Sequence, residues 1–90
     1  MLRHHWTVAT VHKAGRRTSL VRLDEWYGGQ ILASVPTRAL RAALGQERRD
    51  LPGTAFWVMA QLGATTADEL DLREWVPCRR VPPAGGGRAA

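Results

Sequence analysis

Hydrophobic and polar residues alternate in two stretches near the start of the chain. In residues 5–12 (HWTVATVH), Trp6 and Val8 fall on one face of an extended strand, and Thr7, Ala9 and Val11 fall on the other. Residues 18–24 (TSLVRLD) resume a strand pattern after a polar segment in which Gly15 can adopt a positive φ at low cost. The pattern predicts a β-hairpin with a basic tip.

The next apolar stretch is followed by the signals of a short helix. Residues 30–35 (QILASV) have the composition of a third strand, which Pro36 ends. Thr37 is suited to be the N-cap of a helix over Arg38–Leu44, and Gly45 occupies the C′ position, where a left-handed residue is favoured. The sequence therefore predicts a strand and then a helix.

Residues 54–62 (TAFWVMAQL) carry apolar side chains on both faces of a predicted strand. Phe56 and Val58 point one way, whereas Trp57 and Met59 point the other. Such a pattern is typical of a central strand that other elements cover on both sides. A buried helix is the alternative, but the segment has no capping residues for one.

Residues 66–76 combine a helix start signal with a strand pattern. Thr66 and Glu69 have the spacing of a capping box, in which each side chain binds the other residue's backbone N–H. We expect a helical turn followed by a short strand, although a helix reaching Trp75 or a continuous fifth strand fits the same segment.

The end of the chain has a different composition. Residues 77–90 (PCRRVPPAGGGRAA) contain three of the five prolines and a triple glycine, with few apolar side chains to offset the entropy of ordering. Ninety residues suit a single domain. We therefore expect one globular domain at 1–76 and a disordered basic tail at 77–90.

These elements predict an α+β fold. The order β-β-β-α-β-β suits a small twisted antiparallel sheet of four to five strands, able to curl toward a barrel, with one short helix. Five-stranded Greek-key oligonucleotide-binding barrels have the same order of elements. That comparison depends on order alone, because no family motif is found in the chain.

Positive charge exceeds negative charge over the chain as a whole. Thirteen basic residues face eight acidic ones, which gives a net charge of +5, and Lys13 is the only lysine. The guanidinium of arginine is a flat, permanently charged fork that suits phosphate and carboxylate. A small basic domain has nucleic acid as its default partner.

The basic hairpin is the predicted binding site. A basic loop on a sheet can contact a phosphate backbone, because each neutralised phosphate releases a condensed counterion. Trp26, beside a Gly-Gly break, can stack on an unpaired base. The alternative is that the tip is simply solvated and Trp26 belongs to the core. The predicted nucleic-acid-binding residues are Arg3, Lys13, Arg16, Arg17, Arg22 and Trp26.

A second basic group follows along the chain. Arg38 and Arg41 are three residues apart and share a face of the predicted helix, and Arg48 and Arg49 come soon after. Acidic residues lie on both sides of the second pair. We therefore expect a solvated, partly neutralised face here.

No catalytic residue, cofactor or metal is predicted. Cys78 is the only cysteine, which excludes a disulfide within the chain and a multi-cysteine metal site. His4 and His5 are adjacent and point to opposite faces of a strand. The Gly28-Gly29 pair lacks the spacing of a phosphate-binding loop. The chain is not expected to be an enzyme.

The sequence thus predicts a non-catalytic nucleic-acid-binding or nucleic-acid-associated accessory module, with DNA among its expected ligands. A protein–protein adaptor anchored by an exposed Trp26 or Trp75 is the alternative, as is self-association between the acidic segment 68–74 and the hairpin. The longest apolar run, 55–60, is far shorter than the ~20 residues of a membrane span. No signal peptide is recognisable, so we expect no membrane contact and a cytoplasmic location.

Overall fold

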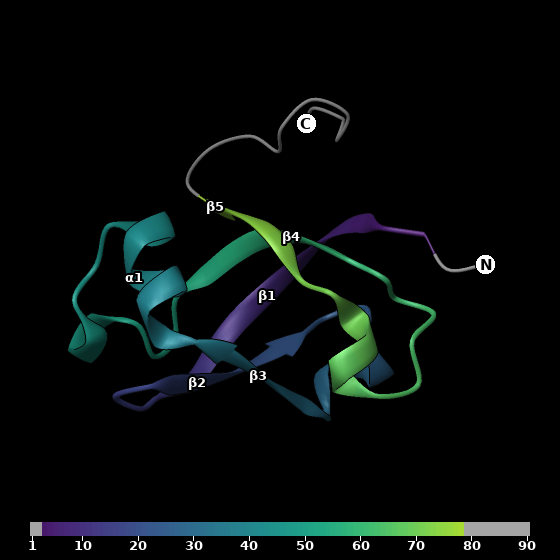
Figure 1. The fold of residues 1–90 in the computed structure, drawn as a ribbon, viewed down its shortest axis with the longest axis horizontal. Helices are drawn as coiled ribbons and strands as arrows, with labels where there is room; N and C mark the ends of the chain where they lie inside the picture. The colour runs from purple at the N-terminus through teal and green to yellow at the C-terminus, as the bar shows by residue number, and fades with distance from the viewer. Residues whose placement is uncertain (1–2, 79–90) are drawn as a thin grey trace.

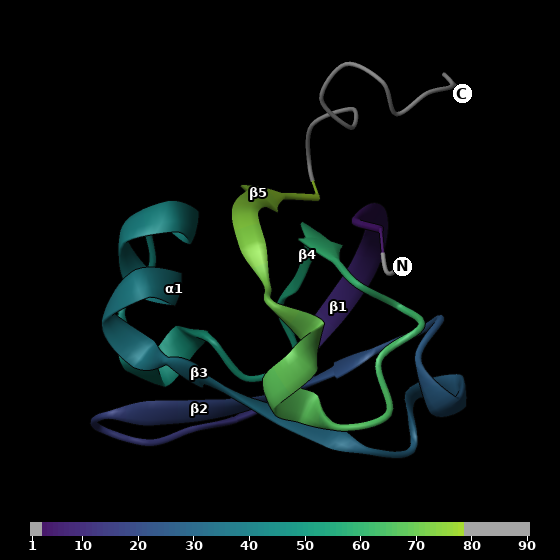
Figure 2. The ribbon, with the colours of Figure 1, turned by 45° about the vertical axis from the view of Figure 1, so that its right-hand side comes forward.

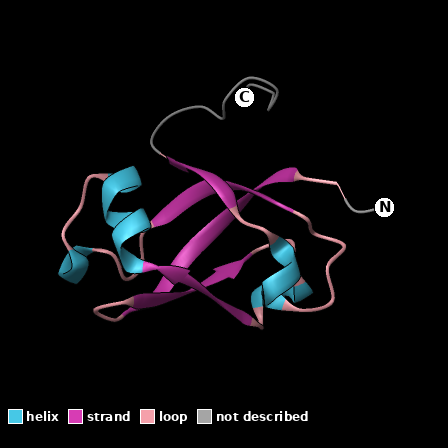
Figure 3. Cartoon of the chain, viewed as in Figure 1, coloured by secondary structure: helices cyan, strands magenta, loops and turns pink. Residues whose placement is uncertain are grey.

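The computed structural model describes residues 3–78 of the 90-residue chain. Within these residues, five strands, one α-helix and three short 3-10 helices follow the predicted order of strands and helix (Figure 3). The elements are β1 (His5–Ala14), β2 (Thr18–Leu23), η1 (Tyr27–Gly29), β3 (Leu32–Pro36), α1 (Thr37–Leu44), η2 (Arg48–Asp50), β4 (Ala55–Ala60), η3 (Ala67–Leu70) and β5 (Arg73–Pro77).

The strands form one antiparallel sheet in the order β3-β2-β1-β4-β5. Strand β1 lies at its centre, and in Figure 1 it runs diagonally to the right of α1. Strands β3 and β5 are the two edges; in the described part of the chain they do not pair, so the sheet curls without closing into a barrel (Figure 2). Helix α1 contacts both edge strands. The predicted α+β fold is confirmed.

One face of the sheet, the inner face, supplies most of the core. Its side chains alternate with those of the opposite face, as pleating requires. Leu40 and Leu44 of α1 pack on it together with Leu51 and Leu70 from the connecting segments. The inner-face residues, all buried, are Thr7, Ala9, Val11, Ser19, Val21, Leu23, Ala33, Val35, Phe56, Val58 and Ala60.

The opposite face, the outer face, is only half-buried. Residues paired across adjacent strands point to the same side of a sheet, so the register places Trp57 beside Val8 and Met59 beside Trp6. The register places the following residues on the outer face: Trp6, Val8, Thr10, Lys13, Leu20, Arg22, Leu32, Ser34, Ala55, Trp57, Met59, Arg73 and Val76.

The expectation that 54–62 is covered on both sides is therefore wrong for one side. Phe56 and Val58 are fully buried, but Trp57 and Met59 are half-buried. The reason is that α1 and the connecting segments contribute their apolar side chains to the core on the inner face. Alternation revealed the two faces without revealing which of them a second layer covers.

Helix α1 begins one residue earlier than predicted. Pro36 is its N-cap, and Thr37 is its first residue. The Thr37 hydroxyl does not cap the helix, because it donates a hydrogen bond to the carbonyl oxygen of Gly15 at 2.7 Å. The predicted helix end is confirmed: Gly45 has a φ of 65°, and its N–H donates to the Arg41 carbonyl oxygen at 2.8 Å.

Residues 66–76 contain a helical turn and then a strand, as expected, but no capping box. The Thr66 side chain makes no cap hydrogen bond. The Glu69 carboxylate instead accepts from the N–H and the hydroxyl of Thr65, at 3.3 and 3.2 Å. Pro77, assigned to the tail by its composition, ends β5. The predicted tail from residue 79 onward lies outside the described residues.

Helices able to cross a membrane, by their length and apolar character, do not occur among residues 3–78.

Candidate functional site

The tip of the β1–β2 hairpin is fastened to the start of α1. Strand β2 pairs with β3 so that Thr18 faces Pro36, directly before the helix. The Thr37 N–H donates to the Arg17 carbonyl oxygen at 2.9 Å, and its hydroxyl donates to the Gly15 carbonyl oxygen. These bonds hold two segments about twenty residues apart in sequence against each other.

The Thr37 hydroxyl is the centre of a buried hydrogen-bond network. Because its single proton goes to Gly15, the oxygen accepts from the hydroxyl of Ser19, 2.7 Å away. Both side chains are no more than 1 % exposed. Burial makes the network costly to break, since a buried polar group without a partner is destabilising. The network therefore fixes the hairpin tip relative to the helix.

Gly15 is required at the tip for a reason other than the predicted positive φ, since its φ lies outside the left-handed region. A Cβ atom at this position would lie 2.8 Å from the carbonyl oxygen of Thr18. The Gly15 N–H donates to that same oxygen at 2.9 Å. Close approach of two backbone segments, not backbone handedness, selects glycine.

This attachment brings together arginines from three segments of the chain. A surface cavity of about 370 Å³ is lined by Thr37 and four arginines. An adjoining cavity of about 500 Å³ adds a fifth arginine from the hairpin tip. We call the five residues the arginine cluster: Arg16, Arg17, Arg38, Arg41 and Arg48.

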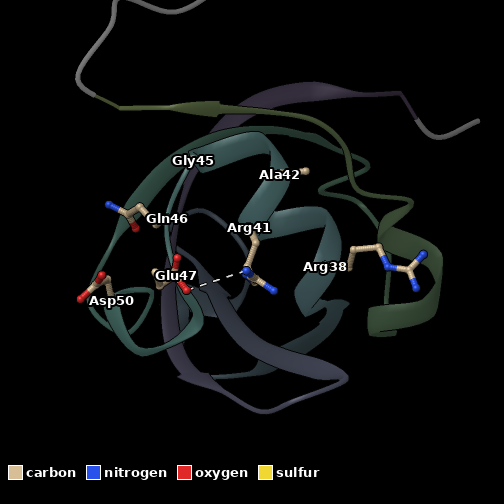
Figure 4. Close-up of a pocket in the computed structure, with 7 residues that line it drawn as sticks. All are labelled: Arg38, Arg41, Ala42, Gly45, Gln46, Glu47 and Asp50. Carbon is tan, nitrogen blue, oxygen red and sulfur yellow. Dashed lines mark ion pairs between the residues drawn. The ribbon is translucent and has the colours of Figure 1, made fainter.

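Carboxylates neutralise little of the arginine cluster. Within residues 3–78, the only ion pair of its members joins Arg41 to Glu47 at 3.8 Å, and both side chains are at least half-exposed. Figure 4 shows this pair on one flank, with Arg38 pointing away from Glu47 and Asp50. An exposed pair of this length contributes little. The cavity walls therefore present several guanidinium groups that can bind an anion.

The start of α1 adds to the positive potential. The first turn of the helix contains no acidic residue, and no side chain caps it. The N-terminal end of a helix carries a partial positive charge from its unpaired N–H groups. Thr37 and Arg38, at that end, both line the 370 Å³ cavity. An anion there would meet the helix end and the guanidinium groups together.

The structure separates the residues predicted to form one site. Arg16 and Arg17 belong to the arginine cluster. Lys13 and Arg22 lie on the outer face, and both are exposed. Arg3 precedes β1 at the end opposite the tip, and a ten-residue strand spans about 33 Å. Arg3 is therefore remote from the cluster.

Trp26 belongs to the core and not to the binding surface. Its ring is 2 % exposed, and the ring N–H donates to the carbonyl oxygen of Ala64 at 2.9 Å. A buried ring has no free face for stacking on a base, and it cannot anchor a protein partner. Trp75, the other proposed anchor, is half-buried and packs against Phe56 with ring centroids 5.8 Å apart.

Sequence reasoning missed the contribution of the second basic group. The i, i+3 spacing of Arg38 and Arg41 placed them on one face, but the acids nearby in sequence favoured a neutralised surface. In the fold, Asp50 lines the neighbouring cavity of about 560 Å³ and not the one with four arginines. The tertiary attachment at Thr37 decides which charges meet.

The remaining reactive groups do not form a site. Burial, with a smaller contribution from Asp24, raises the pKa of the Cys78 thiol and disfavours its reactive thiolate. In the described part of the chain, no three His, Cys, Asp or Glu side chains are grouped to hold a metal ion.

Asp71 lies between Arg73 and His4. Its carboxylate is 2.6 Å from the guanidinium of Arg73 and 3.1 Å from the ring nitrogen of His4. The hydrogen bond from Arg73 is the main reason that the pKa of Asp71 is lowered. These contacts link the start of β5 to the segment before β1.

Comparison of the chain with protein-family models, with curated proteins and with solved structures found no match.

Proposed function

We propose that the protein is a non-catalytic module that binds nucleic acid through the arginine cluster. The observation that supports this most is the cavity whose lining comprises Thr37 and four arginines from the hairpin tip, α1 and η2, with no carboxylate. A guanidinium can bind phosphate through two parallel hydrogen bonds, and nucleic acid repeats this group along its whole backbone.

The chemistry of the interaction is electrostatic. Each guanidinium donates hydrogen bonds to phosphate oxygens, and each neutralised phosphate releases a condensed counterion. The Thr37 network keeps the hairpin arginines and the helix arginines at a fixed separation before the ligand arrives. Less entropy is then lost on binding.

The test is binding of a labelled mixed-sequence oligonucleotide, measured by fluorescence anisotropy at low salt. The Arg16→Glu/Arg38→Glu double variant removes one member from the hairpin and one from α1. We expect its affinity to fall roughly tenfold or more, since hydrogen bonds to charged groups contribute about 1.5–3 kcal/mol each.

A matched control is available in η2. Arg48 lines the four-arginine cavity, whereas the next residue, Arg49, is exposed and does not. Arg48→Glu and Arg49→Glu change the net charge equally. If the arginine cluster binds the phosphates, Arg48→Glu should lower the oligonucleotide affinity clearly more than Arg49→Glu. Equal losses would mean that only net charge matters, and unchanged binding in the double variant would overturn the proposal.

A further inference from the structure

The outer face holds two tryptophans that the core does not use. Trp6 and Trp57 lie on the adjacent strands β1 and β4, and both are half-buried. Trp6 faces Met59 and Trp57 faces Val8, so the two tryptophans are diagonal neighbours. Such neighbours lie roughly 7–8 Å apart, which lets each ring contact a base of its own.

Basic residues lie on the same face as these rings. Arg22 is paired with Thr10 and Leu32, and Lys13 is paired with Leu20 nearer the hairpin tip. Both basic side chains are exposed, and neither is within 4.0 Å of a carboxylate of the described residues. Asp24, whose N–H donates to the Val8 carbonyl oxygen, is an acidic residue next to this face. The face therefore combines aromatic surface with two basic side chains that form no ion pair with the described residues.

The outer face and the arginine cluster meet at the hairpin tip. The stretch of β1 from Trp6 to Lys13 spans about 23 Å, and Arg16 and Arg17 follow at the tip. A flexible strand that stacks on the tryptophans can run along β1 and reach the arginines around the tip. A stiff duplex keeps its bases stacked inside and has no unpaired base to offer.

We propose that the outer face is a stacking platform for unpaired bases, which makes single-stranded nucleic acid the preferred ligand. This inference rests on the proposed function and specifies its ligand class. Stacking on aromatic rings combined with a basic track is how single strands are bound without sequence preference.

Charge favours this occupant over a second copy of the chain. A two-fold related copy would present the same surface. Its Lys13 and Arg22 would then approach the same basic face, and the chain as a whole has a net charge of +5. A phosphate backbone has the complementary charge along its whole length.

The experiment compares two substitutions at each ring position. Trp6→Ile/Trp57→Ile keeps apolar, strand-favouring side chains but removes both flat rings, whereas Trp6→Phe/Trp57→Phe keeps a ring at each position. The probes are one 16-nucleotide mixed-sequence DNA strand, the same sequence as RNA, and the DNA strand annealed to its complement. Thermal unfolding checks that both variants are folded.

We expect the wild type to bind the single strands more tightly than the duplex, with quenching of tryptophan fluorescence. The isoleucine variant should bind single strands roughly tenfold or more weakly and lose the quenching, and the phenylalanine variant should recover most of the affinity. Duplex binding should change little in either variant.

Three results would overturn this inference alone. One is equal or tighter binding of the duplex by the wild type. Another is single-strand affinity that the isoleucine variant leaves unchanged while Arg16→Glu/Arg38→Glu still weakens it; the proposed function would then survive alone. The third is a dimer, seen by sedimentation, that the isoleucine variant dissociates. Absence of binding to all three probes would refute both proposals.

Discussion

The two faces of the sheet differ in how deeply their apolar side chains are buried. On the inner face, Phe56 and Val58 are fully buried under α1 and the connecting segments, while on the outer face Trp57 and Met59 are half-buried. The residues alternate along one strand and have similar hydrophobicity. The difference teaches that apolar character does not determine burial; the position of the second layer does. Stability is expected to depend on the inner face, and stacking on unpaired bases is expected to depend on the outer one.

Adjacent aromatic residues on β4 give the largest expected contrast. Phe56→Ala should lower the free energy of unfolding by about 3–5 kcal/mol, since it leaves a cavity in the core. Trp57→Ala should cost only about 1–2 kcal/mol, from partial burial and cross-strand contacts. Denaturant unfolding monitored by circular dichroism measures both. Equal losses would contradict the distinction between the faces.

Substitution of Thr37 tests whether its buried hydrogen-bond network with Ser19 and Gly15 holds the arginine cluster together. Thr37→Val leaves the Gly15 carbonyl and the Ser19 hydroxyl without their buried partner, at a cost of about 1–3 kcal/mol in the free energy of unfolding. Oligonucleotide affinity should fall too, because the hairpin tip is released from α1. Thr37→Ser keeps the hydroxyl and should preserve both properties. A valine variant with unchanged affinity would show that the cluster needs no such attachment.

A substitution at Thr7, on the inner face, is expected to stabilise the protein, whereas Thr37→Val is expected to destabilise it. Its buried hydroxyl oxygen has no hydrogen-bond partner in the described part of the chain. Thr7→Val should therefore raise the free energy of unfolding, by about 1 kcal/mol, by removing an unsatisfied polar group. Thr10→Val, on the outer face of the same strand, should be close to neutral. Thermal unfolding distinguishes the two, and a destabilised Thr7→Val variant would mean that the hydroxyl has a partner.

The smallest expected effect on stability comes from Asp71, which lies just before β5. Because its pKa is lowered in the folded protein, the carboxylate favours folding above its ordinary pKa of 3.8. That contribution is lost as the pH falls from this value through the lowered pKa. Arg73→Ala should return the pKa of Asp71 toward 3.8, followed by NMR titration. An unchanged pKa would show that Arg73 is not the cause.

The sequence was sufficient to predict the elements because their signals are local. Alternation located the strands, and Gly45 marked the end of α1. Which face of the sheet is covered could not be predicted. The alternating pattern around Trp57 is the same whether other elements cover that face or solvent contacts it. Trp26 shows the same limit: the partner of its ring N–H, Ala64, is 38 residues away.

The candidate site was predicted only in part, for a related reason. Arg16 and Arg17 were identified from their density at a turn. Arg38 and Arg48 join them through contacts that depend on Thr37, whose sequence context indicated a helix cap instead. A single hydroxyl can serve either purpose, and local sequence does not distinguish them.

The salt dependence of oligonucleotide binding tests the central claim most directly. For the wild type and a single strand, log K plotted against log salt concentration should have a slope of about −2 to −4, as expected for several phosphate contacts. Arg16→Glu/Arg38→Glu should reduce the magnitude of that slope by at least about 1, and Arg49→Glu should leave it nearly unchanged. A slope that is the same in all three proteins would contradict a phosphate site at the arginine cluster.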